Sequence, residues 1–295
     1  MNLLNADNII NKKDFSVSEL EEISKLVRSY AITAISYAKS GHTGGTMSII
    51  DIATVLYFKI LNHDPINPLW EYRDRVFWSA GHKAPALYAI LGLLGYFNIN
   101  DIVKLRRFGS GFEGHPNRFK LPGIEVSSGS LGQGLGISVG SALNAKLENK
   151  NYRVYCIMGD GELNEGSVWE AVMSASHYSL NNLCAIVDRN GLQIDGPTHE
   201  VMEIEPIKEK WLSFGWNVIE CYGHNIKELI DAFNISITNK EKPSVIIAYT
   251  IKGKCISFAE NVCSYHGISP KDGLRGEESL ERALLDIGCK IFNED

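Results

Sequence analysis

The sequence of 295 residues lacks the features that mark several large classes of protein. Basic residues are not in excess: 29 lysines and arginines stand against 35 aspartates and glutamates, for a formal charge of −6. We therefore expect no nucleic-acid partner. The short basic run Lys104, Arg106 and Arg107 is interpreted as a solvated helix face. The longest nearly apolar run, residues 87–97, is too short to span a bilayer, so no membrane partner is expected either.

Paired cysteine patterns are also missing. The six cysteines form no CxxC pair and no zinc-ligand spacing. Cys156 and Cys184 lie inside apolar runs, where a free thiol packs as a small hydrophobic side chain. The N-terminal residues are polar and lack the charged-then-apolar pattern of a secretion signal. These observations predict a soluble protein of a reducing compartment, the cytoplasm.

Helices and strands alternate along the predicted chain. Ser16 and Glu19 form a capping box before an amphipathic run, which predicts a helix over about 17–39, stopped by Gly41. Four short apolar runs predict strands: 153–158, 183–188, 216–221 and 244–249. Further helices are predicted over 46–61, 163–179 and about 225–239. This alternation indicates an α/β fold, with a mostly parallel sheet and helices on both faces. Without a repeat, low-complexity tract or long linker, residues 1–295 are expected to form one domain.

Glycine is concentrated between residues 108 and 136, which indicates a loop whose backbone approaches another group closely. Within this stretch, residues 109–114 read GSGFEG and match the dinucleotide fingerprint G-x-G-x-x-G. That fingerprint requires a strand before it, a helix after it and an acidic residue about 20 positions later. Here Pro116 follows the motif and Gly134 occupies the acidic position. We interpret the match as accidental.

Two neighbouring predicted strands end in polar residues. The first reaches Gly159-Asp160-Gly161, and the second reaches Asn190. The carboxyl ends of parallel strands meet at one edge of a sheet, so Asp160 and Asn190 are expected side by side. Their oxygens suit Mg²⁺, and the two glycines leave room for a diphosphate at a helix start. Either motif alone is equally consistent with a turn. Their pairing across one strand–helix–strand unit favours a ligand site.

A Gly-Asp-Gly followed about thirty residues later by asparagine resembles the thiamine diphosphate-binding motif. Nearly the whole chain is similar to the N-terminal, diphosphate-binding part of transketolases. The resemblance is carried by residues 40–57 (SGHTGGTMSIIDIATVLY), 78–91 (WSAGHKAPALYAIL), 114–118 (GHPNR), 129–143 (GSLGQGLGISVGSAL) and 265–270 (YHGISP). It implies the thiamine diphosphate-binding fold and thiamine diphosphate as cofactor. It also implies Mg²⁺, or another divalent cation such as Ca²⁺ or Mn²⁺.

The resemblance also implies roles for the matching residues. The metal ligands would be Asp160, Asn190 and the main chain of Leu192. The cofactor would be lined by Gly129, Leu131, Gly159, Asp160, Gly161, Glu165, Asn190 and His82. The catalytic group would be His42, His82, His115, His266 and Glu165, with the histidines in the sugar channel and Glu165 between two cofactor sites of a dimer. Glu170 is a weaker candidate beside Glu165, or else an exposed helix residue. Ser130 stands where many transketolases have proline, and Cys263 replaces a second late histidine.

The resemblance breaks off where the family's pyrimidine domain would begin. It therefore implies the N-terminal subunit of a split transketolase, paired in an α₂β₂ assembly with a chain that carries the pyrimidine and C-terminal domains. The pair would transfer a two-carbon glycolaldehyde unit from a ketose donor, expected to be a ketose phosphate, to an aldose acceptor. Two alternatives remain: an α-subunit-like half of a 2-oxoacid dehydrogenase or decarboxylase, and a non-catalytic scaffold half. The three Gly-His segments and the GSLGQG loop favour the transketolase.

Overall fold

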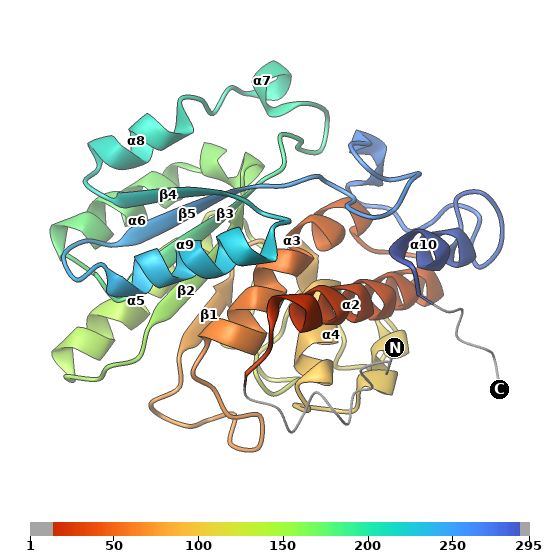
Figure 1. Ribbon diagram of the computed structural model, residues 1–295, viewed down its shortest axis with the longest axis horizontal. Coiled ribbons are helices and arrows are strands. Elements are labelled where there is room, and N and C mark those ends of the chain that lie inside the picture. Colours follow the sequence, from red (N-terminus) through yellow and green to blue (C-terminus); the bar gives the residue numbers. More distant parts are fainter. Residues whose placement is uncertain (1–13, 290–295) are drawn as a thin grey trace.

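The computed structural model describes residues 14–289, and their strands form one five-stranded parallel sheet (Figure 1). The strand order is β1-β2-β3-β5-β4, and every neighbouring pair is parallel. The strands are β1 (Arg75–Trp78), β2 (Val154–Gly159), β3 (Leu183–Arg189), β4 (Asn217–Tyr222) and β5 (Ser244–Tyr249). This confirms the predicted α/β fold class with a mostly parallel sheet. In the part of the chain described, no helix is long and apolar enough to cross a membrane.

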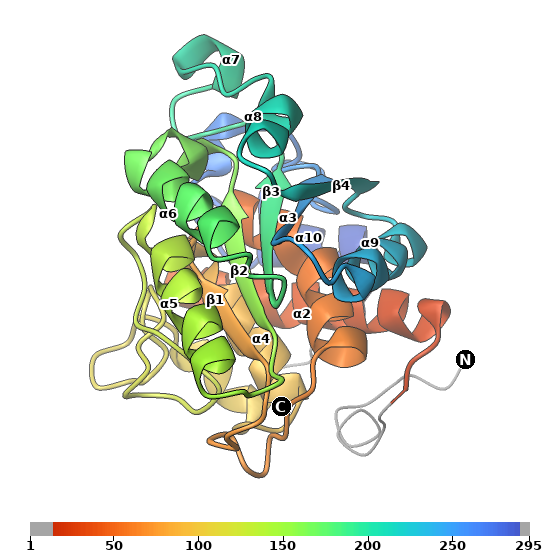
Figure 2. The ribbon, with the colours of Figure 1, turned by 90° about the vertical axis from the view of Figure 1, so that its left-hand side faces the viewer.

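Helices cover both faces of the sheet (Figure 2). One face packs against α5 (Gln133–Leu147), α6 (Gly166–His177) and α8 (Ile207–Ser213). The core on the other face contains α2 (Val17–Ala38), α3 (Thr43–Val55), α4 (Ala84–Leu93) and α9 (Ile226–Thr238), and α10 (Leu280–Ile287) packs against α2. The short α7 (Thr198–Val201) follows β3.

Strand β2 shows why the inner strands β2, β3 and β5 are apolar along nearly their whole length. Tyr155 and Ile157 face the core with α2 and α3, whereas Cys156 and Met158 face the core with α5 and α6. Successive side chains of a strand point to opposite faces, so a sheet covered on both sides needs an apolar residue at every position.

Several helix limits differ from the prediction. The capping box of Ser16 and Glu19 is present, but α2 ends at Ala38 and is capped by Lys39 in the left-handed conformation, two residues before Gly41. The predicted helix over 46–61 is α3 followed by a π-helical turn, Leu56–Ile60. The predicted helix over 163–179 begins only at Gly166, because residues Gly161–Asn164 form a separate 3₁₀ turn.

The prediction of a basic helix face was wrong. Lys104 ends a 3₁₀ helix, Ile99–Lys104, and the chain then turns sharply at Arg106, whose φ is +56°. The N–H of Arg106 donates to the carbonyl of Phe112 at 2.7 Å, which folds this segment back on itself. The GSGFEG motif lies in this loop, with neither a strand before it nor a helix directly after it, as predicted.

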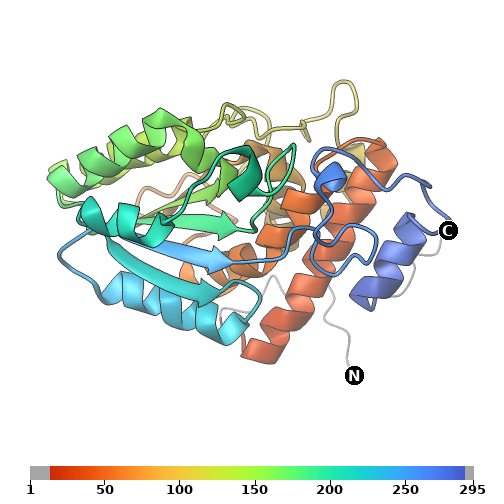
Figure 3. The same ribbon diagram turned by 90° about the horizontal axis from the view of Figure 1, so that it is seen from above.

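The carboxyl ends of β2 and β3 lie side by side. Gly159 pairs in register with Asp188, and the N–H of Asp160 donates to the carbonyl of Asp188 at 3.3 Å. Figure 3 shows the strand arrows pointing the same way, toward the side where the chain continues after β5. The residues predicted to bind a ligand lie at this edge.

Candidate functional site

Asp160 is a buried carboxylate held by the backbone around it. It is 2% exposed. One oxygen accepts from the N–H of Gly161 at 2.8 Å, and the other accepts from the N–H of Gly191 at 2.6 Å and from Arg189 at 3.2 Å. Burial, and then the charge of nearby Asp188, raises the pKa of Asp160. A cation at this carboxylate would offset the cost of burying its charge.

The other two predicted metal ligands lie in the loop after β3. The side-chain oxygen of Asn190 accepts from the N–H of Leu192 at 3.2 Å, and the carbonyl oxygen of Leu192 accepts from Lys252 at 3.1 Å. Gly191, between them, reaches Asp160. Residues 14–289 contain no cluster of three histidines, cysteines, aspartates or glutamates that could bind a metal. Any ion here would therefore have one carboxylate and otherwise neutral oxygens from this chain.

Two buried polar groups in this region lack a partner. The amide nitrogen of Gln193 and the hydroxyl of Ser128 make no hydrogen bond, although both are buried. Each lies over a glycine: a Cβ on Gly161 would be 3.1 Å from Cβ of Gln193, and one on Gly81 would be 2.6 Å from Oγ of Ser128. Unsatisfied buried donors cost free energy. Two such donors, each beside a glycine, suit a diphosphate, whose oxygens are hydrogen-bond acceptors.

Hydrogen bonds to Glu162, a residue that the sequence analysis missed, join the Gly-rich loop at Gly132 to the sheet. Its buried carboxylate accepts from the N–H of Gly132 at 2.8 Å, from the N–H of Gly159 at 3.2 Å and from the hydroxyl of Ser79. Gly132 has a φ of +82°, and a Cβ there would lie 2.6 Å from Oγ of Ser167. Glycine is thus required both for the turn and for the close approach of the loop to the β2 end.

The four predicted histidines form one cluster. The ring of His42 lies 5.2 Å from that of His82, 6.1 Å from that of His115 and 5.7 Å from that of His266, centroid to centroid. The rings of His82 and His266 are 5.4 Å apart. His42 begins α3, His82 follows β1, His115 lies in the long loop and His266 lies after β5, so four distant segments meet here. The Gly-rich loop adjoins the cluster, since a Cβ on Gly129 would lie 3.2 Å from His115.

All four imidazoles are disposed to be neutral at physiological pH. Burial, followed by the charges of Arg106, His115 and Lys252, lowers the pKa of His42 to about 4. Burial and the charge of Lys252 lower the pKa of His266 to about 3. Burial also lowers the pKa of His82 and of His115. Neutral imidazoles can donate from one nitrogen and accept at the other, which suits hydroxyl and carbonyl groups of a sugar.

The hydrogen-bond partners assign the tautomers of two histidines. A guanidinium and an ammonium only donate. Nδ1 of His42 therefore accepts from Arg106 at 3.4 Å, and Nδ1 of His266 accepts from Lys252 at 2.8 Å. Both rings then carry their proton on Nε2. His42 and His266 consequently offer N–H donors to a ligand in the cluster.

A second missed residue, Lys252, links the histidines to the predicted metal ligands. It is 1% exposed and donates to both His266 and the carbonyl of Leu192. Burial lowers its pKa to about 8, against the opposing influence of Asp160. A lysine was not singled out from the sequence because the contact joins segments 60 residues apart.

Below the site lies a buried ion pair between Lys83 and Asp188, 2.5 Å apart. Asp188 also accepts from Ser48 at 2.5 Å and from Thr250. Burial alone would raise the pKa of Asp188, but the ammonium and these hydroxyls hold it below its usual range. The carboxylate thus joins the ends of β1, β3 and β5 to α3 beneath Asp160.

The predicted glutamates and Cys263 lie outside the histidine cluster. Glu165 is exposed at the start of α6, and a Cβ added to Gly132 would lie 2.7 Å from the Cβ of Glu165. Glu170 is exposed one turn further along α6. Cys263 is a half-buried free thiol. Leu131 is half-buried in the Gly-rich loop.

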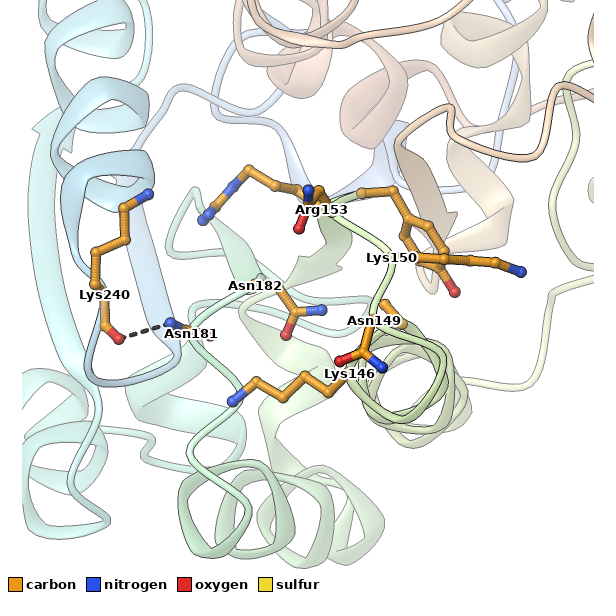
Figure 4. Close-up of a pocket in the computed structure, with 10 residues that line it drawn as sticks. Lys146, Asn149, Lys150, Arg153, Asn181, Asn182 and Lys240 are labelled. Carbon is orange, nitrogen blue, oxygen red and sulfur yellow. Dashed lines mark hydrogen bonds between the residues drawn. The ribbon is translucent and has the colours of Figure 1, made fainter.

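A separate hollow of about 530 Å³ lies at the opposite edge of the sheet, around Lys146, Arg153 and Lys240 (Figure 4). Three of its four cations donate to carbonyls near the ends of helices, Lys146 to Ser179, Arg153 to Ser236 and Lys240 to Ile237, and the fourth, Lys150, is paired with Glu71 and Glu148. Cations at helix C-termini are a common structural feature. Two buried atoms of the lining, Nε of Arg153 and Oδ1 of Asn182, have no hydrogen-bond partner among the described residues.

Known proteins match this arrangement over nearly the whole chain. Residues 20–277 match the family model described as transketolase, thiamine diphosphate binding domain. One of the subunits of the apulose-4-phosphate transketolase of Phocaeicola vulgatus is 40% identical over 276 residues, which cover 93% of this chain and 96% of that one. The 6-deoxy-6-sulfo-D-fructose transketolase subunit SqwG of a Clostridium species is 40% identical over 250 residues, 85% of this chain and 91% of that one.

Solved transketolase structures match the fold of this chain. The crystal structure of transketolase from Campylobacter jejuni superposes with a TM-score of 0.86 at 30% identity, covering 93% of this chain and 43% of that one. The chain thus spans less than half of that transketolase but nearly all of the two relatives above. It belongs to the transketolase family of thiamine diphosphate-dependent transferases, as its N-terminal, thiamine diphosphate-binding domain.

Proposed function

We propose that this chain is the N-terminal subunit of a two-chain transketolase. With a partner that carries the pyrimidine and C-terminal domains, in an α₂β₂ assembly, it transfers a two-carbon glycolaldehyde unit from a ketose donor to an aldose acceptor. The observation that carries the proposal is the meeting of four neutral histidines with the Asp160 edge of the sheet. Relatives of matching length that are named as transketolase subunits support the two-chain arrangement. The cytoplasmic assignment rests on the free thiols.

The diphosphate of the cofactor would lie against Gln193, Ser128 and the glycines beside them. Asp160, Asn190 and the carbonyl of Leu192 would hold Mg²⁺, or Ca²⁺ or Mn²⁺, in contact with that diphosphate. Lys252 adds a positive charge next to the same oxygens. When bound, thiamine diphosphate supplies the carbon nucleophile that attacks the ketose carbonyl.

The histidines of this chain would bind and orient the sugar. Because His42 and His266 hold their protons on Nε2, they can donate hydrogen bonds to sugar oxygens as negative charge develops there. Their low pKa values keep them in this neutral form throughout the physiological range. Glu165, which lies beside Gly132 at the start of α6, would take the role between two cofactor sites that the family resemblance implies.

The two rival functions predict different chemistry. A 2-oxoacid dehydrogenase half would decarboxylate a 2-oxoacid in the assembled complex, which the transketolase relatives do not favour. A scaffold half has no physical need for a cluster of neutral histidines beside unsatisfied donors.

The test is to assay the natively purified complex with thiamine diphosphate and Mg²⁺. We expect transfer of a two-carbon unit between sugars and no release of carbon dioxide from 2-oxoacids. Decarboxylation without sugar transfer would favour the dehydrogenase. A complex that binds no thiamine diphosphate would favour the scaffold.

A further inference from the structure

His224 follows β4 and lies against the segment that follows β5. The N–H of the preceding residue, Gly223, donates to the carbonyl of Tyr249 at 2.7 Å. A Cβ on Gly223 would lie 2.5 Å from Cγ2 of Thr250, so glycine permits this close approach of the two segments. The contact brings the imidazole of His224 to the backbone of Ile251, where Nε2 accepts from the N–H at 2.8 Å.

The other ring nitrogen of His224 faces a buried ion pair. Its Nδ1 lies 2.7 Å from Asp51 on α3, and Arg28 on α2 donates to both oxygens of the same carboxylate, at 3.0 and 2.5 Å. A backbone N–H only donates, so Nε2 of His224 is unprotonated and the ring proton is on Nδ1, which donates to Asp51. All three side chains are buried. The two hydrogen bonds therefore hold His224 in one orientation and one tautomer.

Stability alone does not account for the ion pair of Arg28 and Asp51. Nε of Arg28 is buried without a hydrogen-bond partner among residues 14–289. The desolvation of a buried ion pair often offsets the attraction between its charges, and apolar side chains of similar volume often stabilise a fold as well. The pair has a second consequence, which is that its carboxylate fixes the ring of His224.

The backbone that His224 holds carries Lys252 as its next residue. The N–H groups on both sides of this lysine have partners: that of Ile251 donates to the imidazole, and that of Gly253 donates to the carbonyl of Gly44 at 3.0 Å. From this backbone the ammonium of Lys252 reaches the carbonyl oxygen of Leu192. A binding group keeps its geometry only when the residues behind it are themselves held.

We infer that His224 is a positioning residue for Lys252. By accepting the N–H of Ile251, it fixes the backbone from which the ammonium reaches the edge of the sheet with the predicted metal ligands. This inference rests on the proposed function, in which Lys252 adds positive charge beside the diphosphate. His224 acts through the lysine and takes no part in the chemical step.

The experiment separates the two hydrogen bonds of His224 in the assembled complex. The amide nitrogen of asparagine takes the place of Nδ1, so His224→Asn keeps a donor to Asp51 and loses the acceptor for Ile251. The amide oxygen of glutamine takes the place of Nε2, so His224→Gln restores that acceptor. Each variant is also made together with Lys252→Met.

The control is His63→Asn. The ring nitrogens of His63 are also both hydrogen-bonded, to the hydroxyl of Tyr96 and to the carbonyl of Tyr57, outside the predicted site. This variant reports what the loss of a partly buried histidine does to stability alone, which urea denaturation measures for every variant.

Three quantities test the inference. Calorimetry gives the Kd of thiamine diphosphate with Mg²⁺. Mass spectrometry without the cofactor gives the hydrogen exchange of the peptide that contains Ile251, and the rate at which acetic anhydride acetylates Lys252. The last two report on the backbone and on the ammonium themselves, whether or not the complex is active.

For His224→Asn we expect the Kd to rise about 5- to 10-fold, and exchange at Ile251 and acetylation of Lys252 to become faster by about the same factor, because one hydrogen bond is lost. His224→Gln should stay within about twofold of wild type in all three. Lys252→Met should raise the Kd about tenfold or more, and the addition of His224→Asn should raise it further by less than about twofold. His63→Asn should leave all three quantities unchanged.

Equal values for His224→Asn and His224→Gln, or a loss confined to His224→Gln, would overturn the inference, because the acceptor at Nε2 would then not matter. Additive losses in the double variant with Lys252→Met would also overturn it, since His224 would then act independently of the lysine. If the wild-type complex binds thiamine diphosphate but transfers no two-carbon unit, the proposed function fails and this inference stands. If it binds no thiamine diphosphate, the proposed function fails, and the exchange and acetylation rates decide the inference by themselves.

Discussion

Lys252 donates a hydrogen bond from Nζ to the carbonyl oxygen of Leu192, at 3.1 Å. The residue that carries a predicted metal ligand is thus also in contact with a buried ammonium, and Asp160 is close enough to act on the pKa of that lysine. A second cation beside the metal ligands would help to neutralise a diphosphate, whose negative charge is otherwise costly to bury. The site combines one carboxylate, neutral oxygens and a lysine, so its net charge favours an anion together with a metal.

Replacement of Asp160 by alanine should abolish cofactor-dependent activity. The change removes the only carboxylate among the three predicted metal ligands, so affinity for thiamine diphosphate with Mg²⁺ should fall about 100-fold or more. Calorimetric titration of the complex measures this directly. Asp231→Ala, an exposed carboxylate on α9, should have no effect. Retained activity in Asp160→Ala would refute the metal assignment.

Replacement of Gln193 by alanine should weaken cofactor binding by about tenfold without lowering the free energy of unfolding. The amide nitrogen has no partner in the protein, so its removal costs no protein hydrogen bond but removes a donor to the diphosphate. Titration with thiamine diphosphate and urea denaturation of the same variant separate the two effects. The neighbouring Ile194→Ala, which alters an exposed side chain, is the control. A destabilised variant with normal affinity would contradict the assignment.

Replacement of Lys83 by methionine should lower the free energy of unfolding by about 3–5 kcal/mol, because Asp188 would remain as an unpaired buried charge. Asp188→Asn should also destabilise, and the double variant should lose less than the sum of the two. Urea denaturation measures all three. The matched surface pair, Lys227 with Asp231, should contribute less than about 0.5 kcal/mol. Additive losses at Lys83 and Asp188 would show that the two do not act as a pair.

Stability should decline as pH falls below neutrality, and the histidine cluster should be one cause. The folded-state pKa values of His42 and His266, about 4 and about 3, lie below the usual 6.5. Between pH 6.5 and these folded-state values, the unfolded chain therefore binds more protons than the folded chain. The stabilisation that the neutral histidines contribute is present above pH 6.5 and is lost as the pH falls toward 4.

The double variant His42→Gln/His266→Gln should lose less stability than the wild type between pH 7 and pH 5. We expect a difference of about 1 kcal/mol or more, reduced by the partial solvent exposure of both rings. Urea denaturation at the two pH values is the measurement. Parallel curves for the two proteins would mean that these histidines titrate normally.

Strands β2, β3 and β5 were predictable because each is buried on both faces, so that its sequence is a continuous apolar run. The edge strand β4 was predicted although it is partly exposed, and the four-residue β1 was not predicted. The Asp160–Asn190 edge was predictable for a similar reason, since the parallel β2–β3 pair places both strand ends together. The late start of α6 was not predictable from the sequence. Residues Gly161–Asn164 adopt a 3₁₀ turn instead, and the carboxylate of Glu162 in this turn accepts a hydrogen bond from the N–H of Gly132.

Arg106, Lys83 and Lys252 were missed because their partners are distant in the sequence. Lys83 and Asp188 are separated by 105 residues, and Arg106 and His42 by 64. Such contacts depend on which segments the sheet brings together and leave no periodic pattern behind. A lone basic residue is usually a solvated one, and only the fold distinguishes these three from the rest.

The most direct test of the central claim is to purify the chain under native conditions from its own cells, weigh the complex and assay it. We predict a stoichiometric companion of about 300 residues, the usual size of two domains, and transfer of two-carbon units that requires thiamine diphosphate. A chain that purifies without a companion and binds no thiamine diphosphate would contradict this claim.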